Sequence, residues 1–324
     1  MPVTLLEAQK NVQDDLQLGV IDEFRKNNFL LDTLTFDDAV SPTGGGTTLT
    51  YSYTRLKTQP TAEFREVNSE YTPHEVEKER HSVDLKIFGG SYQIDRVIAN
   101  MGGIVKEVEL QQAQKIKAAS ALFNDTVING DSAVNAKAFD GLDKALAGST
   151  TEFDTGLIDL STSATIDTNY KYFVDALDEF LMGLDGEPGA LMGNSMMIAR
   201  IRAVARRMGQ YQETKDGFGR VISNYGIVPL VDLGAKAGTN DPIVTTKADG
   251  TTSLYAVRFG LDGFHGVTTA DGMPIKTWLP DFSKAGAVKT GEVEMLAAVA
   301  LKATKAAGVF RNIQIKPAAA GGGE

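Results

Sequence analysis

One stretch of the chain, from residue 41 to residue 98, has the residue pattern of β-strands but is too highly charged to bury itself. It alternates polar and apolar residues over 49–54, passes through the charged run 75–81, and alternates again over 83–88. A period of two residues is typical of half-buried strands, whereas an isolated two-stranded ribbon is marginally stable in water. We therefore expect a ribbon that something else must cover. A neighbouring copy of the same chain is the simplest cover, which predicts an assembly protein ahead of an enzyme.

Composition narrows the class of protein. The 324 residues, 42% hydrophobic and 23% charged, are ordinary for a soluble globular chain with one large domain or two to three modest ones. The absence of cysteine excludes disulfides and thiolate metal sites, and only His74, His81 and His265 offer imidazoles. No apolar run approaches the roughly 18 residues of a membrane span, and the N-terminus lacks a signal-peptide pattern. We expect a cytoplasmic, unprocessed start.

The charge is negative overall and unevenly distributed. A net charge of −10 argues against nucleic-acid binding as the main role, because phosphate binding needs clustered Lys and Arg. Residues 1–40 contain eight acids and three bases, whereas residues 198–220 contain six bases and two acids. In copies packed side by side, this asymmetry would help to orient neighbours.

The N-terminal half predicts two helical regions on either side of the ribbon. The first 30 residues have an amphipathic helical pattern, followed by an apolar patch at Phe29, Leu30 and Leu31 that we expect to dock onto a partner. After Gly102 and Gly103, apolar residues at helical spacing predict a helix of about 25 residues that ends at 129–131. Such a length is typical of a spine along which other elements pack.

The C-terminal half predicts alternating short elements. We expect a polar loop over 148–169, a helix from Asn169, a short strand at 190–192, and a second helix with Asn194 as its N-cap. Short strands follow at 220–222, 227–230, 243–246, 253–259, 264–267 and 275–277. Two closing strands, 292–302 and 309–316, are expected around a turn at 305–308, before a tail at 317–324.

No motif predicts chemistry. The chain has no P-loop, Gly217-Phe218-Gly219 lacks the rest of a dinucleotide fingerprint, and the motif around Ser195 departs from a nucleophile elbow. His265 is expected to be a hydrogen-bonded histidine in a sheet. The arginines at 200, 202, 206 and 207 would flank the apolar stripe of their helix, as expected for a helix packed among acidic neighbours. We predict no catalytic residue, no cofactor and no metal site.

The order of these parts resembles the major capsid protein of tailed bacteriophages, the Hong Kong 97 type. An arm, a long ribbon, a spine helix, the Phe139-Asp140-Gly141-Leu142 connector, a mixed domain and two closing strands follow one another over nearly the whole chain. Phrases similar to the family's include residues 253–260, 299–302 and 308–310. The resemblance implies an α+β fold with an N-terminal arm, an extended β-ribbon loop, a peripheral domain with a long spine helix and an axial α/β domain.

The family's layout implies boundaries and partners. The arm would be 1–42, the extended loop 43–98, the peripheral domain 99–165 and 283–317, the axial domain 166–282, and the tail 318–324. The subunits would form hexamers and pentamers of an icosahedral head that encloses double-stranded DNA without reading its sequence. Since the arm begins at Met1, a separate scaffolding protein is implied, or none; a portal and a decoration protein are further partners. The chain would be made in the bacterial host cytoplasm and reside in the virion, with no membrane contact.

The contacts between copies are a further expectation. The candidate residues come from the arm, the ribbon and the basic helix: Phe29, Leu30, Leu31, Tyr51, Tyr53, Arg65, Glu66, Glu77, Arg80, Arg200 and Arg207. Lys57 could in principle form a covalent bond to a neighbour, but no matching Lys, Asn and Glu set is recognisable, so we predict non-covalent stabilisation. An encapsulin-like nanocompartment shell protein shares the implied fold and is the alternative. A cytosolic enzyme without a recognisable motif is the remote one.

Overall fold

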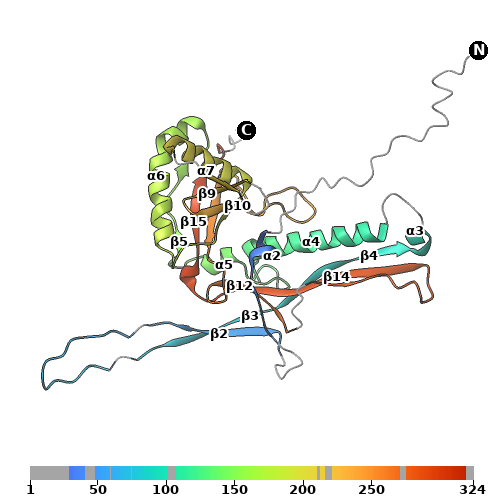
Figure 1. Ribbon diagram of the computed structural model, residues 1–324, viewed down its shortest axis with the longest axis horizontal. Coiled ribbons are helices and arrows are strands. Elements are labelled where there is room, and N and C mark those ends of the chain that lie inside the picture. The colour runs from blue at the N-terminus through green and yellow to red at the C-terminus, as the bar shows by residue number, and fades with distance from the viewer. Residues whose placement is uncertain are drawn as a thin grey trace, which may run out of the picture.

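The computed structural model describes residues 29–40, 48–58, 60–73, 75–100, 107–209, 212–215, 221–270 and 275–318. The helix expected over the first 28 residues, His74 and the start of the long helix lie outside this part. A body of mixed helix and sheet is continued in two directions, by a long ribbon and by a long helix with the strands beside it (Figure 1). No helix of the described residues is long and apolar enough to cross a membrane.

Three sheets organise the described strands. The first has five strands: β1 (Phe36–Val40), β12 (Phe264–Thr269), β14 (Val288–Leu301), β13 (Ile275–Trp278) and β4 (Lys86–Asp95). The second has eight: β5 (Glu152–Phe153), β6 (Ile158–Asp159), β15 (Ala307–Gln314), β11 (Thr251–Val257), β7 (Ala190–Gly193), β10 (Val228–Asp232), β9 (Val221–Tyr225) and β8 (Gln212–Lys215). The third is the expected ribbon, β2 (Thr50–Leu56) paired with β3 (Lys78–Asp84).

The predicted spine helix is confirmed as α4 (Glu107–Asn129), which runs beside β4 and β14 (Figure 1). Phe123, on its apolar stripe, stacks on Phe88 of β4 with ring centroids 6.1 Å apart. The helix stops where the chain turns at Gly130. A Cβ there would lie 2.3 Å from the carbonyl oxygen of Phe139, so only glycine fits this close approach. Short helices α2 (Phe29–Thr33), α3 (Arg96–Asn100) and α5 (Leu142–Leu146) complete this half.

Helices α6 (Ser163–Met182) and α7 (Ser195–Met208) share one hydrophobic core with the eight-stranded sheet. The predicted cap of α7 is confirmed, because Asn194 Oδ1 accepts a hydrogen bond from Met197 N at 2.8 Å. Helix α6 begins six residues before the expected Asn169, so the end of the predicted loop is wrong. Thr162 and Thr165 form a capping box that starts the helix inside a segment whose Ser, Thr and Asp content is typical of a loop.

The two closing strands are present, but they do not form a hairpin. β14 pairs with β12, β13 and β4, whereas β15 pairs with β11, β5 and β6 in the other sheet. The expected turn is a 3-10 helix, Thr304–Ala306, that carries the chain from one sheet to the other. The sheets therefore cut across the implied domain boundaries. β12 and β13 of segment 166–282 pair with β14, and β15 joins the sheet of that segment.

The strand expected at 243–246 is wrong. Ile243 and Val244 are buried, which explains the apolar pattern, but side chains rather than a strand bind their carbonyl groups. Asn129 Nδ2 donates to Ile243 O at 2.8 Å, and Asn194 Nδ2 donates to Val244 O at 3.0 Å. These amides satisfy buried backbone groups without a sheet partner. The other five strands expected between 220 and 277 are confirmed as β9, β10, β11, β12 and β13.

Candidate assembly surfaces

The base of the ribbon rests on the five-stranded part of its own chain. Tyr51 Oη donates to Asp37 Oδ2 at 2.8 Å, Tyr53 Oη donates to Leu301 O at 2.9 Å, and Arg55 Nε donates to Lys302 O at 2.7 Å. These donors come from alternate residues of β2, which places all three on the face that meets the sheet.

The expectation that the ribbon needs a cover from outside is therefore wrong for its base. Tyr51 is buried, and its burial together with the bond to Asp37 raises the pKa of the phenol. Tyr51 is thus unavailable as a contact between copies, and Tyr53 spends its hydroxyl within the chain. Asp37 and Arg55, which hold the base, were missed because neither belongs to a motif and their partners are more than 10 and 200 residues away.

The distal half of the ribbon has no such support. Phe64 is fully exposed, and Leu56, Val67 and Tyr71 are exposed as well. Arg65 Nη1 donates to Ser69 O at 3.0 Å, and its guanidinium lies 5.4 Å from the centre of the Tyr71 ring, so the tip contacts only itself. We name residues 56–77 the ribbon tip. It carries large apolar side chains that the described part of the chain does not cover.

Four of the expected contact residues lie on or beside this tip. Glu66 is exposed and accepts hydrogen bonds through its carbonyl from Ser69. Glu77 faces Lys57 at 3.4 Å, and Arg80 Nη2 donates to Ser52 Oγ at 3.1 Å across the ribbon. All are exposed, as Arg65 is, and remain candidates for contact with a second copy. Phe64, Val67 and Tyr71 were missed; their signal is apolar residues in an otherwise polar, charged stretch.

The apolar patch of the arm packs inward. Leu30 is fully buried in the same core as Phe123 and Phe264, and Phe29 meets Phe259 edge to face at 6.1 Å. The expectation that Leu30 docks onto a partner is therefore wrong. Leu31 is partly buried against the same core. Apolar residues at helical spacing indicate burial, but the pattern does not say whether the same chain or another one covers them.

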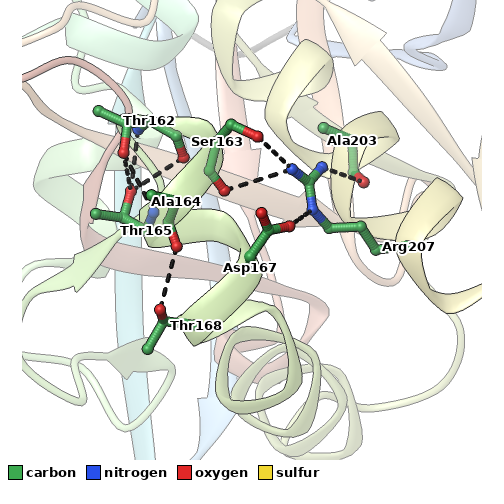
Figure 2. A network of polar contacts seen from close by, with 8 residues as sticks. All are labelled: Thr162, Ser163, Ala164, Thr165, Asp167, Thr168, Ala203 and Arg207. Atoms are coloured by element: carbon green, nitrogen blue, oxygen red, sulfur yellow. Dashed lines mark hydrogen bonds and ion pairs between the residues drawn. The ribbon is translucent and has the colours of Figure 1, made fainter.

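The basic helix α7 uses two arginines to hold its own chain together. Arg200 Nη2 donates to Ser161 O at 2.6 Å, and its Nε donates to Ile315 O at 3.3 Å. Arg207 pairs with Asp167 and donates to Ser163 Oγ at 2.9 Å, which ties the C-terminal end of α7 to the N-terminal turn of α6 (Figure 2). This confirms acidic packing for Arg207. Contact of either arginine with another copy stays a prediction.

His265 differs from its expected state. Its side chain is fully buried beside Tyr51, with ring centroids 5.8 Å apart, and neither ring nitrogen has a hydrogen-bond partner among the described residues. Burial lowers the pKa of the imidazole, and the nearby Lys302 lowers it further. The expectation of a hydrogen-bonded histidine is wrong, and the ring is held neutral.

The largest polar cluster near the ribbon is a structural one. A hollow of about 350 Å³ between the ribbon base and α5 contains Lys144, whose ammonium lies 2.7 Å from Asp131 and 2.9 Å from Asp140. The hydrogen bonds from Lys144 help to lower the pKa of both carboxyls and raise that of the lysine itself. The described residues contain no group of three or more His, Asp or Glu side chains placed to hold a metal ion.

No protein-family model matches the sequence, and no curated protein matches it. Several solved structures share its fold. The SrpI encapsulin of Synechococcus elongatus is 14% identical with a TM-score of 0.67, and the match covers 97% of each chain. A chain of Mycobacterium phage Bobi is 10% identical with a TM-score of 0.60, covering 96% of this chain and 99% of that one. The capsid of an empty GTA particle is 13% identical with a TM-score of 0.58, covering 95% and 97%.

These likenesses extend over nearly the whole chain and establish the fold. The chain has the Hong Kong 97-like capsid fold expected from the order of its segments, with mixed helix and sheet, an extended ribbon and a spine helix. Proteins of the same fold build closed shells in both phage capsids and encapsulins. Fold alone does not fix function, which depends on the surfaces that this chain presents.

Proposed function

We propose that this protein is a shell subunit, the major capsid protein of a tailed phage, whose hexamers and pentamers close into an icosahedral head around double-stranded DNA. Its role is structural rather than catalytic. The observation that carries the proposal is the ribbon tip, which projects from the body with exposed apolar side chains and no cover from the described part of its own chain.

The energetics of such a tip favour contact with a second copy. Phe64 and Val67 lie almost entirely in water, and burying large apolar side chains is worth about 1.5–3 kcal/mol each. Each contact is weak, but a closed symmetric shell repeats it in every subunit. The base of the ribbon, held by Tyr51, Tyr53 and Arg55, fixes the direction in which the tip projects.

The proposal is tested by shortening the ribbon without disturbing its base. Lys57 N donates to Glu77 O at 2.8 Å, so residues 59–76 can be replaced by Asn-Gly, a pair suited to a two-residue hairpin turn. Light scattering and negative-stain microscopy should find hollow particles for the natural chain and folded, unassembled subunits for the shortened one. As a matched control, Phe64→Ser with Val67→Ser keeps the ribbon length and should weaken assembly. Normal shells from the shortened chain would overturn the proposed role of the tip.

A cellular nanocompartment is the second candidate, because the encapsulin match has a higher TM-score, 0.67, than the phage and GTA matches at 0.60 and 0.58. The content of purified particles distinguishes the two. Nuclease-resistant double-stranded DNA supports a phage head, and an enclosed protein without DNA supports a compartment. A scaffolding protein, a portal and a decoration protein belong to the first candidate and would be identified in the same particles.

A further inference from the structure

A hollow at the C-terminal end of α6 is lined mainly by apolar side chains. It measures about 550 Å³ and lies between the end of the helix, the loop over 183–188 and the turn from β9 to β10. Its apolar lining comprises Leu181, Met182, Leu184, Pro188, Ile227 and Val228. Met182 is 88% exposed and Ile227 is 66% exposed, so the two form an uncovered apolar lip. An open apolar hollow of this size is a typical docking surface.

The surroundings of this hollow are acidic. Asp178 and Glu187 line it, and Asp175 and Glu179 lie on the same half of α6. The last turn of α6 carries no basic residue, although cations are the charges that a helix C-terminus favours. The side chains of Asp175, Glu179 and Glu187 have no ion pair among the described residues. The hollow therefore suits an apolar side chain that comes with Lys or Arg.

The opposite end of α6 adjoins a basic surface. Arg207 is bound to Asp167 and Ser163 at the N-terminal turn of α6 (Figure 2), which places the end of α7 there. Beside it, Arg206 is exposed and has no hydrogen bond or ion pair within the described residues, and the Nε of Arg202 is buried without a partner. At 1.5 Å per residue, the 15 residues from Asp167 to Met182 separate the two ends by about 22 Å.

We propose that the acidic hollow of one copy receives the basic end of α7 of the next copy, and that this head-to-tail contact closes the rings from which the shell is built. The inference rests on the proposed function and names the surfaces that join the subunits. The two surfaces are complementary in charge and lie at opposite ends of one helix, so one subunit cannot satisfy both by itself. A contact between different patches of identical subunits is heterologous, and heterologous contacts generate rings.

The absence of natural cysteine makes the contact directly testable. Glu187 and Arg206 are both exposed and unpaired, so Glu187→Cys and Arg206→Cys should leave the subunit folded. The double variant is assembled and treated with a short bis-maleimide crosslinker, then analysed in SDS. We expect a ladder from dimer up to a closed five- or six-membered ring. Each single variant should remain monomeric, because a heterologous contact never brings two identical positions together.

Other outcomes overturn the inference. Dimers from either single variant would show a two-fold contact, and shells of the double variant without any crosslink would show that other surfaces form the rings. The latter result leaves the shell function intact, whereas the absence of shells from the natural chain would remove the proposed function and this inference together. A charge exchange gives an independent check. Glu187→Lys or Arg206→Glu alone should abolish ring formation, and the two together should restore it.

Discussion

A single buried histidine makes the ribbon base sensitive to acid. His265 lies edge-on against Tyr51 without a hydrogen-bond partner, so protonation would bury an uncompensated charge. Burial and Lys302 lower the pKa of His265, and Asp37 opposes them only in part. Because the folded pKa lies below the unfolded value of about 6.5, the unfolded chain takes up the proton first as the pH falls. The free energy of unfolding should therefore decrease below about pH 6.5, by at most about 1.4 kcal/mol per pH unit.

Urea unfolding of the subunit between pH 8 and pH 5 measures this effect. His265→Leu removes the titrating group and should flatten the decline, although the absolute stability of the variant can differ. His81 stacks on Tyr53 but is part-exposed, so His81→Leu should keep the dependence on pH. An equal decline in the natural chain and in His265→Leu would contradict the assignment.

Arg311 is the residue that ties the two sheets together through charge. It pairs with Asp143 of α5 and, at 2.8 Å, with Glu152 of β5, while Tyr255 Oη donates to Asp143 at 2.7 Å. Its side chain is mostly buried, so removing it leaves two carboxylates without their cation. We expect Arg311→Met to lower the free energy of unfolding by about 3 kcal/mol. Arg258→Met, whose carboxylate partners are exposed, should cost less than about 1 kcal/mol; equal losses in urea unfolding would contradict this ranking.

At the scale of elements, one arginine sets the attachment of the ribbon. Arg55 donates to Lys302 O at 2.7 Å, to Leu301 O and to Thr304 Oγ1 at 3.3 Å, all at the end of β14. We expect Arg55→Met to increase amide hydrogen exchange in β2 and β3 several-fold while α7 is unchanged, since local opening follows the loss of local contacts. Arg65→Met, at the ribbon tip, serves as the matched control. Unchanged exchange in β2 would show that the tyrosines alone hold the base.

Elements were predictable from sequence where the signal is local. The stripe of α4, the Asn194 cap of α7 and the alternation of β2 and β3 each depend on neighbouring residues, and each is confirmed. Pairings were not predictable. β14 and β15 read as a hairpin because they are adjacent in sequence, yet each is completed by strands far away in the chain. The candidate contacts fared similarly: exposure of Arg65 and Glu77 follows from charge, but the burial of Leu30 and Tyr51 depends on which surface lies opposite.

At the scale of the whole molecule, two hydrophobic cores support two kinds of surface. One core joins α2, α4, α5 and the five-stranded sheet, and the other joins α6 and α7 to the eight-stranded sheet. β15 and β11 contribute residues to both, because their two faces point into different cores. The ribbon projects from the first core and the acidic hollow opens on the second, so a rigid body holds the two proposed contact surfaces in a fixed relation.

The assembled particle should be held together without covalent bonds between subunits. An isopeptide bond needs a lysine beside an amide or carboxyl side chain in a dry site with a catalytic carboxyl group. Lys57, the lysine at the start of the ribbon tip, is instead more than half exposed and faces Glu77 at 3.4 Å, in contact with water. Particles boiled in SDS should therefore give one band near 35 kDa, and Lys57→Arg should leave both assembly and band unchanged. A ladder of multiples that disappears in Lys57→Arg would instead show a covalent shell and locate its bond on the ribbon.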